Sequence, residues 1–453
     1  MDIHPKESRL EEFISNPQKS LWKLSIPMML GMAVQAVYML VDTAFIGKWV
    51  GGTALAALGY IFPLLFILMG ITFGLGSGAT TVIAQFIGAK DKEKADNAAL
   101  HTLLLGLIIG IIVIIFGFYY GETFIKAQGA SVEATQLALD YFYIMAAGSI
   151  FMVLAIFFRS ILSGEGDMIF PMKVLGFGTI LNIILDPFLI YNYQIAGAAY
   201  ATVISQIAVT IIYINFLLFR QHCYLSFNFN QFKIDTNIIK DIFRLGLPAS
   251  LSMIIMSMGI VLFNRILSNS DAVAAYQTAG RLEHLFFLPI ISIATSLVTL
   301  VGMFYGAKRI DLIWIIIKYG LSRSILISFS FSIFFYLYSQ NIMPTFTDSK
   351  EIIRLSTLYF KIMAFAYPFI TVGMTCSRIM QGLGYAYPML ILTLFRVVIV
   401  SASLASYFVF ILKKPIYYAW VGTLISCILT ALVSLMWLRS ILRNVFKTVP
   451  SIN

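Results

Sequence analysis

Charged residues are scarce in this chain of 453 residues, of which Asp, Glu, Lys and Arg make up only 11%. Soluble globular domains carry roughly 25% charged and 45–50% apolar residues. Here 60% of the residues are apolar, and the mean hydropathy is +0.89. This composition argues against a water-soluble enzyme and predicts a protein folded in lipid.

Cysteine is also rare, and catalytic motifs are missing. Cys223, Cys376 and Cys427 lack metal-ligand spacing, and their odd number argues against a complete disulfide framework. The sequence has no Walker motif, no His-Glu metal motif and no nucleophile elbow. We therefore expect no enzymatic activity, no ATP hydrolysis and no cofactor.

Basic residues outnumber acidic ones, giving a formal net charge of +10. On a soluble protein this excess would suggest a nucleic-acid partner. Here Lys and Arg occur in short clusters between apolar runs, which is typical of a membrane topology signal. We expect membrane lipids, and no nucleic acid, as partners.

Twelve apolar runs are long enough to cross a membrane, which takes about 20 residues as a helix. A polar stretch at 220–245 separates six runs from six. The predicted spans are 24–47, 53–76, 98–118, 138–160, 172–190, 196–219, 246–268, 274–304, 316–338, 355–377, 389–411 and 417–438. The sequence thus predicts an all-α integral membrane protein with twelve transmembrane helices in two six-helix bundles.

The distribution of Lys and Arg predicts the orientation, because positively charged loops stay cytoplasmic. Most of them fall on the side that holds both tails and the central stretch, so both termini are expected in the cytoplasm. The polar N-terminus lacks the apolar core of a signal peptide, and the short tails favour a prokaryotic plasma (inner) membrane. The expected parts are a tail (1–23), an N-terminal lobe (24–219), a linker (220–245), a C-terminal lobe (246–438) and a tail (439–453).

The two halves of the sequence resemble each other. LSIPMML (24–30) recurs as LGLPASL (245–251), IAQFIGAK (83–90) as VGMFYGAK (301–308), and SGEGDMIFPM (163–172) as QGLGYAYPM (381–389). Two further matches, 54–59 with 272–277 and 201–205 with 422–426, keep the same order at a nearly constant spacing. Six spans per copy give both copies the same orientation, related by a pseudo-two-fold axis along the membrane normal. Two such bundles form an alternating-access carrier.

Acidic residues inside the spans are costly and mark ion or substrate pathways. Asp42, Asp186 and Glu283 lie within the predicted spans. Asp186 and Thr202 each lie eight residues from a predicted turn near Gln194, so both are expected roughly 12 Å deep.

Other polar residues are predicted to lie at the same level of the first bundle. Asn182 is one helical turn from Asp186, about 6 Å away, and Pro187 invites a kink near position 183. Tyr38 is one turn from Asp42 on the first span. We expect Tyr38, Asp42, Asn182, Asp186 and Thr202 to converge.

Such a site has two physical uses. Its oxygens can ligate a small hard cation such as Na⁺, or burial and mutual repulsion can make one carboxyl take a proton near neutral pH. The alternative is that Asp42 and Asp186 only bond neighbouring backbone in a packed bundle.

The second half has no acid at the corresponding positions, which are 260–263 for Asp42 and 403–407 for Asp186. This difference suggests that the coupling ion binds the first bundle. Glu283 is a possible second-lobe site, and it either lines the cleft or is neutralised by another span.

The abundant aromatic and methionine side chains, including 38 Phe, 23 Tyr and 20 Met, suit a cleft that binds flat apolar cations. We assign no individual one of them to the substrate.

Nearly the whole chain resembles the multidrug and toxic compound extrusion (MATE) transporters. The resemblance rests on the six-plus-six spans, the repeated L-x-x-P entry to spans one and seven and the Gly-Ala-Lys loops. It also rests on YMLVDTAFIG, on LNIILDP and on GAAYAT. It implies that Asp42, Asn182, Asp186 and Thr202 form a cation site, that Pro27 is a first-span proline whose bending accompanies protonation in some members, and that Tyr38 neighbours the site. Some members carry an essential acid in the seventh span, whereas this sequence has none from Met253 to Met258.

The leading hypothesis is an antiporter that exports organic small molecules, expected to be cationic, in exchange for H⁺ or Na⁺. The alternative is a flippase of lipid-linked oligosaccharides, which would need basic residues in its cleft. Arg281, Arg323 and Arg396 are the candidates. A channel or an intramembrane enzyme lacks support, and two self-sufficient lobes favour a monomer.

Overall fold

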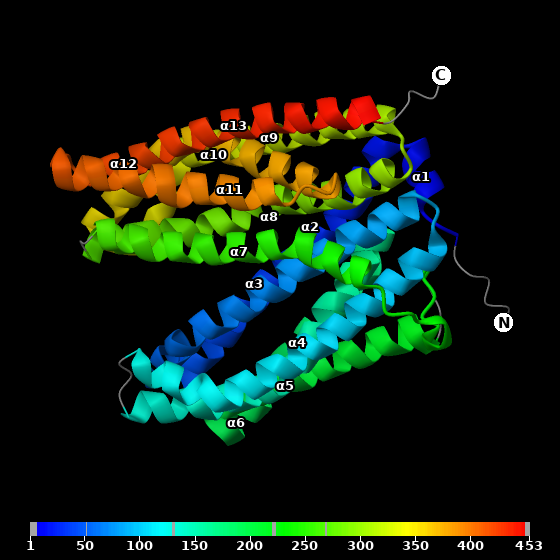
Figure 1. The fold of residues 1–453 in the computed structure, drawn as a ribbon. Helices are drawn as coiled ribbons and strands as arrows, with labels where there is room; N and C mark the ends of the chain where they lie inside the picture. Colours follow the sequence, from blue (N-terminus) through cyan, green and yellow to red (C-terminus); the bar gives the residue numbers. More distant parts are fainter. Residues whose placement is uncertain (1–6, 51, 129–131, 220–222, 268–269, 449–453) are drawn as a thin grey trace. The chain divides into compact units, whose positions relative to one another are not determined.

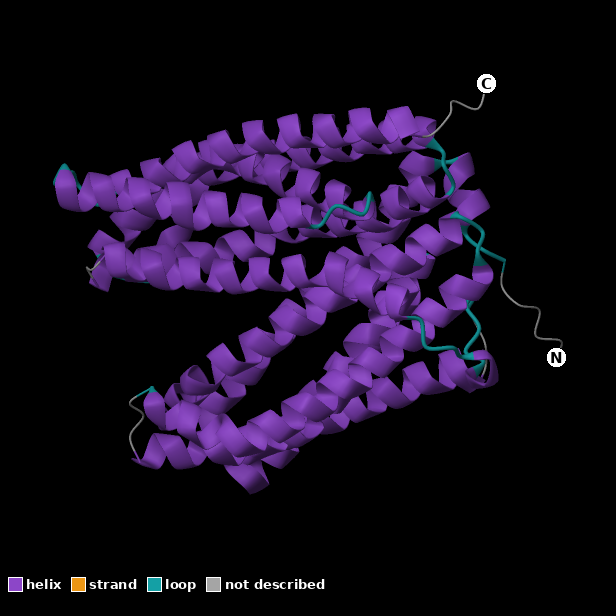
Figure 2. Ribbon diagram, in the orientation of Figure 1, coloured by secondary structure: helices purple, strands orange, loops and turns teal. Residues whose placement is uncertain are grey.

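The computed structural model describes residues 7–50, 52–128, 132–219, 223–267 and 270–448 (Figure 1). The side chains of residues 38–44, 47–48, 52–53, 55–56 and 231 lie outside the described set. Helices make up nearly all of the described ranges, and no strand occurs in them (Figure 2). This is the result expected in lipid, where a helix satisfies every backbone amide within its own segment.

The long helices are mostly longer than the apolar runs that predict them. They are α2 (Pro17–Trp49), α3 (Gly52–Gly88), α4 (Lys92–Ala127), α5 (Val132–Glu165), α6 (Ile169–Ile214), α7 (Thr236–Leu267), α8 (Ser270–Gly306), α9 (Ile310–Ile342), α10 (Lys350–Gly382) and α13 (Tyr418–Thr448). Shorter elements are α1 (Leu10–Ser15), α11 (Tyr387–Leu394), α12 (Ser403–Ser406), the 3₁₀ turns η2 (Phe229–Gln231) and η3 (Met343–Thr345), and the π-helical segments η1 (Asn215–Phe219), η4 (Phe395–Ala402) and η5 (Tyr407–Ile411).

Helix α6 consists of two membrane-spanning arms. Its 46 residues would reach about 69 Å as one helix, more than twice the hydrocarbon thickness of about 30 Å. The helix breaks at Gln194, which has φ 53° and ψ −131°. Eleven helices of the described chain are long and apolar enough to span, and the break in α6 makes twelve spans, as the sequence predicts.

The two arms of α6 run antiparallel and touch at glycines. A Cβ on Gly197 would lie 2.1 Å from the carbonyl oxygen of Leu189. A Cβ on Gly178 would lie 2.5 Å from Cγ2 of Val209. These close approaches fix the register of the hairpin, because no larger residue fits at either glycine without a shift.

The chain divides into two compact units. Unit 1 holds the chain up to Glu11 together with Pro27–Gly246, and unit 2 holds Glu12–Ile26 together with the chain from Leu247 onward. The chain therefore passes from one unit to the other inside α2, at Pro27, and inside α7, next to Pro248.

Each unit is built around one central helix. In unit 1, α5 packs against α3, α4 and α6, and Phe142 and Met145 of α5 lie in a core with Ile61, Ile190 and Ala198. In unit 2, α10 packs against α8, α9 and α13. There Phe335 and Phe360 stack with their ring centroids 4.4 Å apart in a core that also holds Trp420.

The short helix α1, which the sequence does not predict, is anchored to unit 1 at its start. Leu10 and Phe13 of the α1 segment are buried. Arg9 donates to the carbonyl oxygen of Gly166 at 2.9 Å and to Oδ2 of Asp167 at 2.7 Å. Asp167 also accepts backbone hydrogen bonds at the start of α6, so one carboxylate serves both segments.

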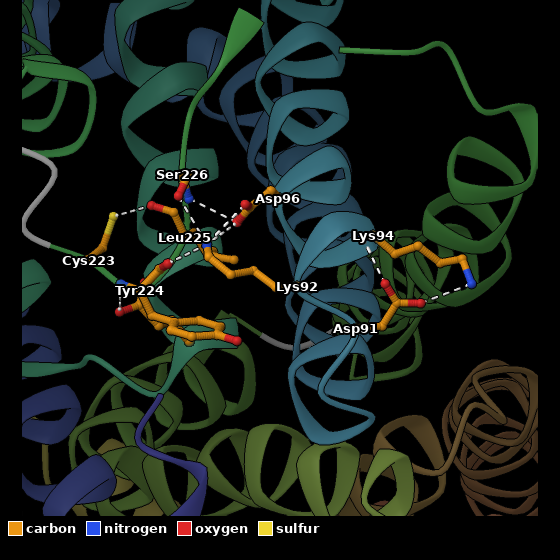
Figure 3. Close-up of polar contacts among 9 residues, drawn as sticks. Asp91, Lys92, Lys94, Asp96, Cys223, Tyr224, Leu225 and Ser226 are labelled. Atoms are coloured by element: carbon orange, nitrogen blue, oxygen red, sulfur yellow. Dashed lines mark hydrogen bonds and ion pairs between the residues drawn. The ribbon is translucent and has the colours of Figure 1, made fainter. Parts of the chain in front are cut away.

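The central segment after α6 is held on unit 1 as well (Figure 3). Nζ of Lys92 donates to the carbonyl of Tyr224 at 2.8 Å and to Oγ of Ser226 at 3.0 Å, and it pairs with Asp96 at 3.0 Å. The N–H of Ser226 donates to Asp96, and that of Tyr224 donates to Glu165, each at 2.8 Å. The end of α5 and the turn that follows it thus anchor both the N-terminal and the central segment.

Candidate functional site

The first arm of α6 carries two buried polar side chains one helical turn apart. Asp186 is fully buried, and Asn182 is 3% exposed. Neither the amide nitrogen nor the amide oxygen of Asn182 has a hydrogen-bond partner within the described part of the chain. A buried amide without partners costs roughly 1–3 kcal/mol per group, so the polar atoms of this side chain gain by binding a partner.

Pro187 directly follows Asp186 and has no N–H, so the carbonyl of residue 183 loses its helical donor. The arm nevertheless keeps helical dihedral angles there, since the non-helical position inside α6 is Gln194. The kink expected near position 183 stays a prediction, and the reversal of chain direction occurs at the turn between the arms.

Thr202 lies on the second arm at the level of Asp186. The contacts of Gly197 with Leu189 and of Gly178 with Val209 set the register. In this register Asp186 lies opposite residues 200–201, next to Thr202. Thr202 is half-buried, and its hydroxyl donates to the carbonyl of Ala198 at 3.0 Å, so its oxygen lone pairs can accept or ligate.

Tyr38 and Asp42 fall in helix α2, but their side chains lie outside the described residues. Pro27 lies in the same helix, half-buried, where the chain enters unit 1. The described portion of the predicted site therefore consists of Asn182, Asp186 and Thr202. These side chains supply an amide, a carboxylate and a hydroxyl.

Glu283 lies in unit 2, on α8, and is held by two tyrosines of α10. The Tyr367 hydroxyl donates to Oε1 at 2.6 Å, and the Tyr359 hydroxyl donates to Oε2 at 3.1 Å. Both tyrosines are buried, with 2% and 3% of their surface exposed. Sequence reasoning missed them, although their spacing of eight residues puts them on one face of the tenth span.

The oxygen set on α6 suits a proton or a small hard cation better than a transition metal. Hard cations prefer carboxylate, carbonyl and hydroxyl oxygens. In the described residues, no three His, Cys, Asp or Glu side chains gather as a metal cluster. The carboxylate, amide and hydroxyl oxygens among these described residues are chemically suited to reversible binding of a proton or a cation.

The sequence profile of the MatE family matches residues 27–188 and 248–406, one match in each half of the chain. The chain belongs to the MatE family. MatE proteins are transporters and not enzymes, and the long apolar helices make this one a multi-pass integral membrane protein.

Three bacterial MatE relatives are similar over most of their length. The probable multidrug resistance protein YoeA of Bacillus subtilis is 27% identical over 420 residues, 89% of this chain and 90% of that protein. The probable multidrug resistance protein NorM of Thermotoga maritima is 24% identical over 446 residues, 95% of this chain and 94% of that one. The multidrug export protein MepA of Staphylococcus aureus is 26% identical over 388 residues, 84% and 85% of the two chains.

Solved MatE structures share the whole fold. A transporter of the MOP superfamily from Pyrococcus furiosus, whose binding pocket is described as having reverse polarity, matches with a TM-score of 0.93 at 31% identity, covering 98% of this chain and 100% of that one. An outward-facing multidrug resistance MATE family transporter matches with a TM-score of 0.92 at 30% identity, with the same coverage. The two-bundle architecture expected from the internal repeat is thus confirmed for this MatE chain.

Proposed function

We propose that this MatE protein is a multidrug efflux antiporter that exports organic, cationic compounds by alternating access while H⁺ or Na⁺ enters. The names of the relatives from B. subtilis, T. maritima and S. aureus support multidrug export. The coupling site comprises Asp42, Asn182, Asp186 and Thr202, with Pro27 and Tyr38 as neighbours.

The observation that carries this proposal is the buried pair on the first arm of α6. Asp186 is fully buried within a membrane-spanning arm, and Asn182 presents a buried amide with no hydrogen bond among the described residues. A buried carboxylate is costly when charged, so it gains by binding a proton or a cation. Bound Na⁺ would take oxygens from all three described side chains.

Exchange requires that ion and drug favour different states of the transporter. If the ion stabilises one orientation of the two units and the drug stabilises the other, each ligand weakens the binding of the other. The two ligands need no common atoms for this coupling. Asp186 then controls transport by its occupancy.

Ethidium efflux from proteoliposomes tests the proposal. A proton gradient alone and a sodium gradient alone are imposed in turn on wild type, on Asp186→Asn and on a matched control, Asp140→Asn. Asp140 is an exposed acid on α5 that accepts a hydrogen bond from Gln136 at 3.1 Å. Efflux under one gradient that Asp186→Asn abolishes and Asp140→Asn keeps would identify the coupling ion. Full efflux in Asp186→Asn would overturn the site.

A second coupling site at Glu283 has its own support, because two buried tyrosines hold its carboxylate inside unit 2. The flippase alternative rests on Arg281, Arg323 and Arg396, which lie on three different elements. Arg323 stacks on the ring of Tyr319 at 4.9 Å. Folded protein that moves no ethidium under either gradient would favour the flippase, with lipid-linked sugars as the next substrates.

A further inference from the structure

Unit 2 has a groove where the internal repeat places the counterpart of the acidic site. The repeat relates Asp42 to residues 260–263 and Asp186 to residues 403–407, and neither range contains an acid. The groove has a volume of about 450 Å³ and lies between α7 and the segment running from η4 to η5. Its lining is Leu262, Arg265, Ile266, Val398, Ala402, Ser403, Ser406 and Phe410. Both counterpart ranges contribute to this lining.

The one charged side chain among the described residues that line this groove is the basic Arg265, whereas the proposed site in unit 1 holds the acidic Asp186. Arg265, in the last turn of α7, is exposed and has no ion pair among the described residues. Ser403 is exposed and Ser406 is half-buried on the facing segment. The remaining walls are aliphatic or aromatic, and none of the described residues that line the groove is acidic.

The acid nearest to Arg265 along the chain, Asp271, lies in the first turn of α8, six residues after Arg265. Arg396 lies on the facing segment, two residues before Val398, but it does not line the groove, and its side chain hydrogen-bonds to Cys427 of α13. Glu283, an acid inside unit 2, already accepts hydrogen bonds from Tyr359 and Tyr367.

The helix that supplies the serines is distorted on both sides of them. It is π-helical over Phe395–Ala402 and again over Tyr407–Ile411, where the N–H of Leu412 donates to the carbonyl five residues back at 2.9 Å. Such insertions are rare and often occur at functional sites. The first arm of α6, its counterpart in unit 1, is α-helical up to Gln194.

A further pair of hydroxyls includes Ser401, the neighbour of Ala402 in the groove lining. Thr423, which the repeat relates to Thr202, shares a hydrogen bond of 2.9 Å with Ser401. These two hydroxyls hydrogen-bond to each other, whereas the first bundle presents the amide of Asn182 and the hydroxyl of Thr202. The polar groups left for a ligand are Arg265, Ser403 and Ser406.

We propose that this groove binds a single-chain amphiphile with an anionic head group, such as a long-chain carboxylate. Arg265 holds the head group through charge-assisted hydrogen bonds, and the two serine hydroxyls donate to the same anion. The apolar walls hold the chain. The volume falls within the roughly 300–1,000 Å³ of small-ligand sites.

Binding is measured without transport, so the result is independent of the proposed function. The probe is 11-(dansylamino)undecanoic acid, titrated by fluorescence against the full chain in a neutral detergent. We expect saturable binding that Arg265→Gln weakens about tenfold and Arg265→Lys largely retains, because the lost interaction is charge-assisted. Ser403→Ala with Ser406→Ala should weaken it less.

The matched control is Arg354→Gln, since Arg354 is an exposed arginine of α10 whose guanidinium is paired with Glu351. It should bind like wild type. Equal binding by Arg265→Gln, with an unchanged melting temperature, would overturn the proposal. So would equal affinity for an uncharged dansyl amide of the same chain length. Displacement of the probe by phosphatidylglycerol but not by dodecanoate would contradict a single-chain ligand and favour a two-chain lipid.

Discussion

Lys90 and Lys308, which the internal repeat relates to each other, share a left-handed backbone conformation, with φ angles of 58° and 57°. Gly166 and Gly384 are related in the same way, with φ angles of 84° and 91°. Gln194 and Lys413 form a third such pair, with 53° and 49°. All six positive-φ residues of the described chain thus pair through the repeat. Positive φ is unfavourable for residues other than glycine, so the duplication is retained even in the strained turns.

The close contact between the arms of α6 should not tolerate a methyl group. Gly197→Ala would place Cβ 2.1 Å from a backbone oxygen of Leu189, so the arms must separate and Thr202 must move relative to Asp186. We expect a loss of about 1–3 kcal/mol in stability and a loss of efflux. Melting in detergent measures the first effect, and proteoliposome efflux measures the second.

Gly176→Ala on the same helix is the control for this substitution, because no atom lies within 4 Å of its added Cβ. Alanine there should be neutral or stabilise by up to about 1 kcal/mol through helix propensity. Equal melting temperatures for the two variants would contradict the tight register of the hairpin.

The ion pair between Arg9 and Asp167 should contribute measurably to stability, because both side chains are largely buried, at 18% and 8% exposed. Arg9→Gln, Asp167→Asn and the double variant form a thermodynamic cycle. We expect a coupling energy of about 1–3 kcal/mol. Asparagine keeps the oxygen that caps the start of α6, so the cycle isolates the ion pair. Simple additivity of the two single substitutions would show that the ion pair does not contribute to stability and that α1 is held by Leu10, Phe13 and the bond from Arg9 to Gly166.

The rate at which Cys223 reacts with maleimide should report how firmly the segment after α6 is held on unit 1. The thiol is buried and donates to the carbonyl of Leu225 at 3.1 Å, and burial raises its pKa well above the ordinary value. Because the thiolate is the reactive form, native protein should react slowly with maleimide at pH 7.5. Lys92→Gln removes the bonds to Tyr224 and Ser226 and should speed labelling severalfold.

The labelling experiment uses a background in which Cys376 and Cys427, both buried, are replaced by serine. Lys94→Gln serves as the comparison, since Lys94 pairs with Asp91, the residue that caps the start of α4, away from Tyr224 and Ser226 (Figure 3). Acceleration by both variants alike would indicate general loosening of α4.

Glu283→Gln should reduce efflux less than Asp186→Asn does. The glutamine oxygen still accepts from Tyr367, so the local structure is kept while the charge is lost. Tyr367→Phe should lower the melting temperature, because it leaves a buried carboxylate oxygen without this donor. Complete loss of coupled efflux in Glu283→Gln would move the coupling site to unit 2.

The spans could be predicted because a helix must have a minimum length to cross the lipid. The turn at Gln194 could be predicted because it lies in the middle of an apolar stretch that is too long for a single span. Helix α1 could not be predicted, since its burial depends on Arg9 reaching Asp167, which is distant in the sequence. The π-helical segments near Ser403 have no local sequence signal. Tyr359 and Tyr367 became partners of Glu283 only through the packing of α8 against α10.

The depth match of Asp186 and Thr202 followed from counting residues on each side of one turn. Whether Pro187 bends the first arm of α6 could not be predicted by counting residues, because it also depends on the packing around the helix. Arg265 could not be predicted from the repeat, because it lies two residues after the range that corresponds to Asp42 and not within it.

Neither compact unit is a contiguous stretch of the chain. The polypeptide enters unit 2 at Glu12, leaves it at Pro27 and returns at Leu247. A gene cut in the central loop would therefore give a first fragment carrying a leading segment that belongs to the other unit, and a second fragment lacking it. Split halves should therefore need co-expression, because neither fragment alone holds all the residues of one unit.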